Sequence, residues 1–311
     1  MYKGVKGAQH VGMGVRDYGA MKEFYGKTLE MTKPYAEFPE VWNAMVEVFR
    51  TSYHKFAGVM FAQEAGGIIV ELISMSIPVP RPIRKVKRYG DIGVNKIVIA
   101  VSDVEKFCKD YGNRVNFASK PKSVSLPAWG EYRFVYARDP EGNLIEFVSG
   151  PKFQVKDQFG GVRWLGISVT DLERSMEFYQ KYVGFDTVVA KPHDNYSGQV
   201  DEVSGAPGTK VRSCLLANSR GGGMLELYEC LKPRGRSIPL NTYWGDFGYL
   251  EISIEADDIH EMGNHCKKEG LDFLHNPCVA FELEDKELWF MYIKDPDGIP
   301  VETVAEMPKA R

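Results

Sequence analysis

The segment "HVGMGVRDYGAMKEFYGK", residues 10–27, aligns without a gap on "WLGISVTDLERSMEFYQK", residues 164–181. Two later segments repeat in the same way, because residues 90–107 align on 245–262 and residues 134–147 align on 290–303. The spacing between matched acids is nearly constant: 154 residues from Asp17 to Asp171, 155 from Asp103 to Asp258 and 156 from Glu146 to Glu302. A constant period across three blocks indicates a tandem duplication. The sequence therefore predicts two domains, residues 1–150 and 161–311, with the join between them.

Each half contains a weaker repeat of its own. "HVGMGVRD" at residues 10–17 resembles "KIVIAVSD" at 96–103, and "GGIIVELIS" at 66–74 resembles "EGNLIEFVS" at 141–149. Alternation places Val11, Met13 and Val15 on one face of a strand. An Asp then precedes apolar residues at helical spacing and is expected to cap a helix; these residues are Asp17, Asp103, Asp171 and Asp258. Two or three short strands separated by Gly or DPxG turns follow. The predicted fold is α+β, with the order βαβββ occurring four times.

Composition narrows the class of protein. The 311 residues include 39 Lys+Arg and 42 Asp+Glu, a net charge of −3, so there is no general basic field for nucleic acid or for a membrane surface. The sequence contains no apolar run of about 18 residues and shows no secretory leader. Its five cysteines form no CxxC pair, which is typical of reduced thiols. We expect a soluble cytoplasmic protein.

One segment has a local excess of positive charge. "RPIRKVKRYG", residues 81–90, carries five cationic side chains and one proline, with two more prolines directly before it at positions 78 and 80. This composition favours an exposed linker. The alternative is that the segment binds the anionic tail of a substrate.

The last strand of each unit contains one carboxylate among apolar residues. Such an acid is costly to bury unless it is paired, hydrogen-bonded or bound to a metal. The four acids are Glu71, Glu146, Glu226 and Glu302. Seven residues before each capping Asp, the first strands supply His10, Lys96, Trp164 and Glu251. Their repeated positions predict that the acids face something cationic or hydrogen-bond donating.

Four βαβββ units with a polar residue early in strand one and a Glu in strand four resemble the vicinal oxygen chelate (VOC) family, and so do the "DPEG" and "DPDG" turns. That family includes glyoxalase I, methylmalonyl-CoA epimerase, bleomycin-resistance proteins and extradiol dioxygenases. The resemblance implies that two units form one half-open β-barrel, so that the chain has two glyoxalase-like domains. It also implies that strands one and four of both units hold a metal inside the barrel.

The pairing of the units decides which residues can bind a metal, because a protonated Lys cannot ligate and an indole only donates. Sequential pairing would place Lys96 in one barrel and Trp164 in the other, so both sites would be impaired. Crossed pairing, unit one with four and two with three, would unite His10, Glu71, Glu251 and Glu302 as a complete ligand set. The second barrel would then collect Lys96, Glu146, Trp164 and Glu226, where the ammonium neutralises carboxylates and the indole fills the space. Ligand chemistry favours the crossed arrangement.

One imidazole and three carboxylates suit a divalent Mn, Fe, Co, Ni or Zn ion; no other cofactor is indicated. The resemblance implies that the ion chelates adjacent oxygens of a small organic substrate and stabilises an enolate or enediolate, while Glu302 or Glu71 carries the proton. The expected reaction is an isomerisation, an epimerisation or a lyase reaction.

Two alternatives stay open. An extradiol ring-cleaving dioxygenase matches the length and the four-unit plan, but its iron needs two His and one carboxylate, and the corresponding first-strand positions here are Trp164 and Glu251. A metal-free binding or resistance protein would require His10 and the glutamates to be structural. Either a monomer or a homodimer is compatible with four units, and neither nucleic acid nor a membrane is an expected partner.

Overall fold

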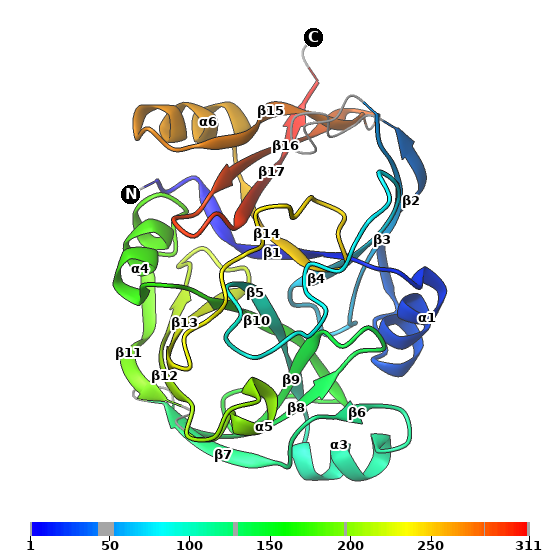
Figure 1. Cartoon of the computed structure of the whole chain (residues 1–311). Coiled ribbons are helices and arrows are strands. Elements are labelled where there is room, and N and C mark those ends of the chain that lie inside the picture. The colour runs from blue at the N-terminus through cyan, green and yellow to red at the C-terminus, as the bar shows by residue number, and fades with distance from the viewer. Residues whose placement is uncertain (1, 43–52, 127–129, 196–197, 283, 310–311) are drawn as a thin grey trace.

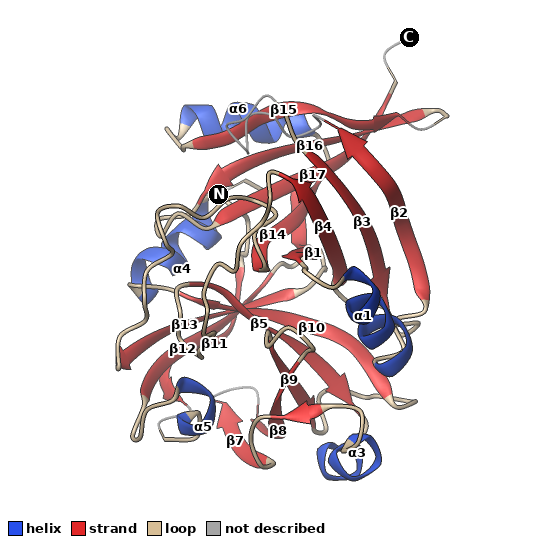
Figure 2. Ribbon diagram, turned by 45° about the vertical axis from the view of Figure 1, so that its right-hand side comes forward, coloured by secondary structure: helices blue, strands red, loops and turns tan. Residues whose placement is uncertain are grey.

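The computed structural model of the chain describes residues 2–42, 53–126, 130–195, 198–282 and 284–309. These residues form two curled sheets with a few helices at the periphery (Figures 1 and 2). The predicted α+β fold of four repeated units, forming two glyoxalase-like half-barrels, is confirmed.

The four units follow the predicted order, with small additions in the first three. The first unit contains β1 (Val5–Gly14), α1 (Tyr18–Glu23), the π-helical turn η1 (Phe24–Thr28), β2 (Lys33–Trp42), β3 (Lys55–Ala62) and β4 (Ile69–Ile77). The second contains β5 (Gly93–Val101), α3 (Val104–Tyr111), β6 (Asn116–Phe117), β7 (Lys122–Leu126), β8 (Gly130–Arg138) and β9 (Leu144–Ser149). The third contains β10 (Phe159–Ser168), α4 (Leu172–Lys181), β11 (Thr187–Asn195), α5 (Asp201–Ser204), β12 (Lys210–Ala217) and β13 (Met224–Lys232). The fourth contains β14 (Gly248–Ala256), α6 (Ile259–Lys268), β15 (Phe273–Glu282), β16 (Lys286–Lys294) and β17 (Pro300–Pro308).

Each sheet draws on both halves of the sequence. The first sheet has the strand order β15-β16-β17-β14-β1-β4-β3-β2, and therefore joins the first unit to the fourth. The second sheet has the order β11-β12-β13-β10-β5-β9-β8-β6, with β7 paired to β8, and joins the second unit to the third. The units meet through antiparallel pairs of first strands, β1 with β14 and β5 with β10. The crossed pairing favoured by ligand chemistry is confirmed.

The helices begin where the sequence predicts. The side chain of Asp17 accepts a hydrogen bond from the backbone N–H of Ala20 at the start of α1, and the matched acids cap α3, α4 and α6 in the same way. Such a side chain satisfies one of the backbone donors left free in the first turn of a helix. The strand-to-helix junction is therefore the same in all four units.

The apolar residues fall into a helix-side core and two strand-side cores. Val11, Met13 and Val15 lie in the first, together with the buried faces of α1, α3, α4 and α6. The opposite face of each sheet has its own apolar cluster, which is built mainly from strand residues. The predicted alternation along β1 is therefore observed, and it directs His10 away from the helices and toward the strand-side face.

Turns of the second and fourth units also join the two sheets. Glu141, in the DPEG turn, accepts hydrogen bonds from the backbone N–H groups of Arg16 and Asp17 at 2.6 and 2.8 Å. Asp297, in the DPDG turn, accepts one from Thr170 at 2.8 Å. Sequential units are thus connected by turns, whereas crossed units share a sheet.

The basic segment 81–90 is a connector, as predicted, but it is not exposed throughout. Arg84 and Lys87 are partly buried, and Tyr89 is fully buried in the second sheet's cluster. The segment runs beside the connector between β13 and β14, since Ile83 donates its N–H to Phe247 O and Phe247 donates to Arg81 O. Packing against this second connector therefore buries part of a segment that its composition predicts to be exposed.

The five cysteines are free thiols, and three of them are buried. No helix in the described part of the chain is both long and apolar enough to cross a membrane.

Candidate metal centre

The first sheet brings its four predicted site residues onto one face. His10 lies in β1, Glu71 in β4, Glu251 in β14 and Glu302 in β17. Gly12 of β1 is the register partner of both Glu71 and Glu251. A Cβ at Gly12 would lie only 2.3 Å from Glu251 Oε1, so the glycine provides the space in which these side chains converge.

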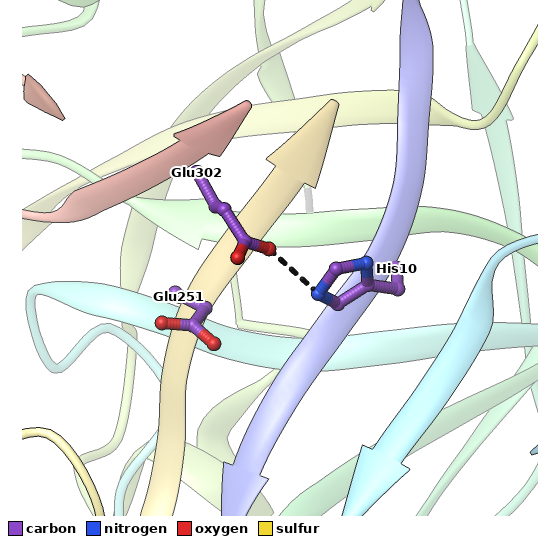
Figure 3. A group of neighbouring side chains, drawn as sticks. All are labelled: His10, Glu251 and Glu302. Carbon is purple, nitrogen blue, oxygen red and sulfur yellow. Dashed lines mark ion pairs between the residues drawn. The ribbon is translucent and has the colours of Figure 1, made fainter. Parts of the chain in front are cut away.

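Three of these residues form a compact group, shown in Figure 3. One ligand atom each from His10, Glu251 and Glu302 lies within 4.8 Å of the others. His10 Nε2 lies 2.8 Å from Glu302 Oε2. Glu71 stands beside this group, with its Oε2 at 3.5 Å from His10 Nε2. All four side chains are buried.

Burial and crowding of acids change the protonation of this group. Burial lowers the pKa of His10, but the Glu302 and Glu71 carboxylates outweigh it, and the net pKa is raised. Burial raises the pKa of Glu71 to about 7, with His10 opposing and Glu302 reinforcing the shift. Burial, followed by Glu302 and Glu71, raises the pKa of Glu251 well above its ordinary value. The cluster therefore holds protons that a divalent cation would displace.

The residues present fit a divalent metal ion. They offer one imidazole nitrogen and several carboxylate oxygens, a donor set that suits first-row divalent ions. Glu251 Oε1 is buried and has no hydrogen-bond partner among the described residues. Within that same part of the chain, no Lys or Arg forms an ion pair with any of the four. Protons and His10 thus balance these acids in the absence of metal, and a bound divalent cation would take over that role.

Two aromatic residues near the group were not singled out as site residues from the sequence. Trp244, in the connector before β14, donates its indole N–H to Glu251 Oε2. Tyr292 of β16 is buried, and its pKa is raised well above the ordinary value by burial and by Glu251, Glu302 and Glu71. Each stands at a repeat position matched by a tyrosine, Tyr89 or Tyr136, that contacts the other cluster. Aligning the repeats could therefore have identified both aromatic residues as site residues from the sequence.

The second sheet collects the other four predicted residues: Lys96 in β5, Glu146 in β9, Trp164 in β10 and Glu226 in β13. Lys96 Nζ forms an ion pair with Glu146 and lies 2.9 Å from Glu226 Oε2. The Trp164 indole donates to the same Glu226 oxygen at 3.0 Å. None of the four is more than 4% exposed. The ammonium and the indole are therefore placed as the sequence predicted.

This second cluster is neutralised from within. Burial lowers the pKa of Lys96, but Glu146 and Glu226 outweigh it, and the net pKa is raised. The rings of Tyr89, Tyr136 and Tyr228 also surround Lys96 Nζ, with their centroids at 5.5, 5.5 and 5.6 Å. A cation held between two acids and three aromatic faces stays charged despite its burial.

Comparison with known proteins agrees with the repeat and the fold. The family model described as Glyoxalase/Bleomycin resistance protein/Dioxygenase superfamily matches residues 7–147 and again residues 161–303. The chain belongs to this superfamily. No curated protein matches the sequence.

Solved structures share the whole architecture. Glyoxalase I from Zea mays is 18% identical, with a TM-score of 0.62, over 96% of this chain and 92% of that one. A putative dioxygenase from Bacillus subtilis is 13% identical, with a TM-score of 0.58, over 99% of this chain and 87% of that one. At these identities the likeness is one of fold.

Proposed function

We propose that the protein is a divalent-metal-dependent enzyme that catalyses proton transfer on a small organic substrate with adjacent oxygens. The observation that carries this proposal is the convergence of His10, Glu251 and Glu302 within 4.8 Å on one buried face. The charges of the site agree with it, because three acids share one imidazole and the described residues supply no other cation.

In this proposal His10, Glu251 and Glu302 hold the metal, with Glu71 as a fourth ligand until substrate binds. The ion would act as a Lewis acid on two neighbouring substrate oxygens and favour the enolate or enediolate form. Bound donors must be deprotonated, so His10 and Glu251 release their protons when the site is loaded.

The protein's own part in the reaction is to hold and move a proton. Glu71 stands outside the three-residue group and lies 3.5 Å from His10, so once substrate binds, its carboxylate would be free to move a proton while the other three residues keep the ion. A group with a pKa near the working pH is an effective general base. Glu302, paired with His10, is the second carboxylate within reach. The outcome is an isomerase, epimerase or lyase.

The first experiment measures metal content. The full chain, purified without chelator, should carry about one divalent ion, and His10→Ala and Glu251→Ala should each lose it. His260→Ala is the matched control, because His260 is exposed on α6. Absence of metal after supplementation with Mn, Fe, Co, Ni and Zn would contradict the proposal and favour a metal-free binding protein.

Reaction type is tested next by incubating α-hydroxycarbonyl and thioester substrates in D₂O. Deuterium should enter the carbon beside the carbonyl with the wild-type chain, and Glu71→Gln should slow this exchange while retaining the metal. Fe²⁺-dependent oxygen uptake with catechols, without deuterium exchange, would point to ring cleavage instead.

A further inference from the structure

A pocket lies where the two connectors between units meet. The connector between β4 and β5 and the one between β13 and β14 run side by side in the middle of the molecule, cyan and yellow in Figure 1. The pocket has a volume of about 40 Å³, and its walls include the cations Arg84 and Lys87, the acid Asp91, and Asn143, Phe247 and Tyr249. It is separate from both clusters of site residues.

Arg84 brings into this pocket a cation whose charge is poorly balanced. Its Nη2 donates to the backbone oxygens of Arg236 and Ser237, both at 2.8 Å. Its one acidic neighbour among the described residues is Asp91, at 3.6 Å from Nε. Arg236 already binds both oxygens of that carboxylate at 2.7 Å. The Arg84 Nη1 group has no hydrogen bond within the described part of the chain.

Lys87 brings a second cation with neutral partners. Its ammonium donates to Asn143 Oδ1 at 2.5 Å and to the backbone oxygen of Glu141 at 3.2 Å. No carboxylate of the described residues lies within ion-pair distance of it. The carboxylate of Glu141 is turned to the backbone of residues 16 and 17. Burial lowers the pKa of Lys87, with Asp139 and Glu141 opposing the shift.

Lys87 has only neutral partners, and Arg84 shares its one carboxylate with Arg236. Burying cations in this way is costly, and an anion between them would offset part of that cost. The space between the two cations suits a small anion. A water molecule needs roughly 10–15 Å³ in this measure, so the space accepts about three waters or one small oxyanion. Lys87 retains one unused N–H and Arg84 two, which matches the acceptors of a phosphate or carboxylate group.

We propose that the pocket between the connectors is a binding site for a small oxyanion, held by Arg84 and Lys87. The site is independent of the proposed metal centre. Strands β5 and β14 both begin at this pocket, through Val94 and Gly248, and they carry Lys96 and Glu251. A bound anion would therefore lie beside the first residues of the strands that lead into both clusters.

The test is titration calorimetry of the full chain with inorganic phosphate, at constant ionic strength against chloride and with chelator present. Phosphate should bind with a Kd on the order of 1 mM or tighter. Arg84→Met and Lys87→Met should each weaken binding about tenfold, because each removes a charge-assisted hydrogen bond. Lys85→Met is the matched control, since Lys85 is exposed on the same segment, and it should leave the affinity unchanged.

A second titration with acetate identifies the source of the oxyanion. Tighter binding of phosphate assigns a phosphate ligand, whereas tighter binding of acetate assigns a carboxylate. Glu302→Ala, which removes a proposed metal ligand, should keep the affinity for the oxyanion. If Arg84→Met fails to fold, Lys87→Met decides, because Lys87 does not join the two connectors. No saturable binding of either anion, or equal weakening by Lys85→Met, would overturn the proposal.

Discussion

The two sheets hold matched clusters of buried glutamates, but the charge of these acids is balanced differently in each. Each places two strand-four glutamates beside two first-strand residues, around a glycine that is the register partner of two of them. In the second sheet Lys96 neutralises Glu146 and Glu226 from within. In the first sheet the matched position holds Glu251, so acids accumulate instead. Two exchanged first-strand side chains, Lys96 against Glu251 and Trp164 against His10, separate a self-neutralised cluster from one that favours an external cation.

Removing one matched glutamate from each cluster should give the largest difference between them. Glu302→Ala should abolish metal retention and activity while leaving the fold intact, because it removes one of the three proposed ligands. Glu146→Ala, at the matched position of the second sheet, should leave metal content unchanged. Elemental analysis and circular dichroism measure both effects. Full metal retention in Glu302→Ala would sink the assignment of the first sheet as the metal centre.

Removing the internal cation should cost stability without affecting metal. Lys96→Met leaves Glu146 and Glu226 buried without their partner and should lower the free energy of unfolding by about 3–5 kcal/mol. Urea denaturation measures it, with the exposed Lys109→Met as control, expected within about 0.5 kcal/mol of wild type. Equal stability of the two variants would contradict the internal neutralisation of the second cluster.

In the metal-free chain, replacing Glu by Gln should change the stability in opposite directions at the matched positions 71 and 226. Glu71 has a pKa of about 7 in the folded state against an ordinary 4.5. Its contribution to stability is therefore present below pH 4.5 and lost as pH rises through 7. Glu71→Gln cannot ionise and therefore avoids this loss. In protein kept metal-free by chelator, the gain in free energy of unfolding from this substitution should be about 3 kcal/mol larger at pH 8.5 than at pH 5.

Glu226→Gln, at the matched position, removes a partner of Lys96 and should destabilise the chain at pH 8.5. Urea unfolding of both variants at the two pH values measures the contrast. Parallel pH profiles for wild type and Glu71→Gln would show that Glu71 is ionised in the folded state as it is in solution.

The smallest expected effect concerns the indole of the second cluster. Trp164→Phe removes the 3.0 Å hydrogen bond to Glu226 and should show a coupling of about 1–2 kcal/mol with Glu226→Gln in a double-mutant cycle. Strict additivity of the two substitutions would mean that Trp164 acts by filling space alone.

Much of the local structure followed from the sequence. The period of about 155 residues and its weaker half-period predicted four βαβββ units, and alternation along residues 10–15 assigned His10 and Val11 to opposite faces. Asp17 and its counterparts marked the helix starts, because capping depends on residues only three apart in the chain. The strand-four glutamates were recognisable because a lone acid in an apolar strand needs a partner.

The tertiary structure decided which of these local units meet. His10 and Glu302 lie 292 residues apart, and either pairing of units satisfies the strand and helix patterns; ligand chemistry favoured the crossed pairing, and the sheet order established it. The contact of Trp244 with Glu251 and the partial burial of Arg84 and Lys87 depend on how connectors pack, which no short-range periodicity encodes. The sequence by itself determined the repeated unit and the residues able to carry chemistry, because those depend on local propensity and side-chain type. Only the tertiary structure decided their grouping, because long-range strand pairing results from the packing of whole faces.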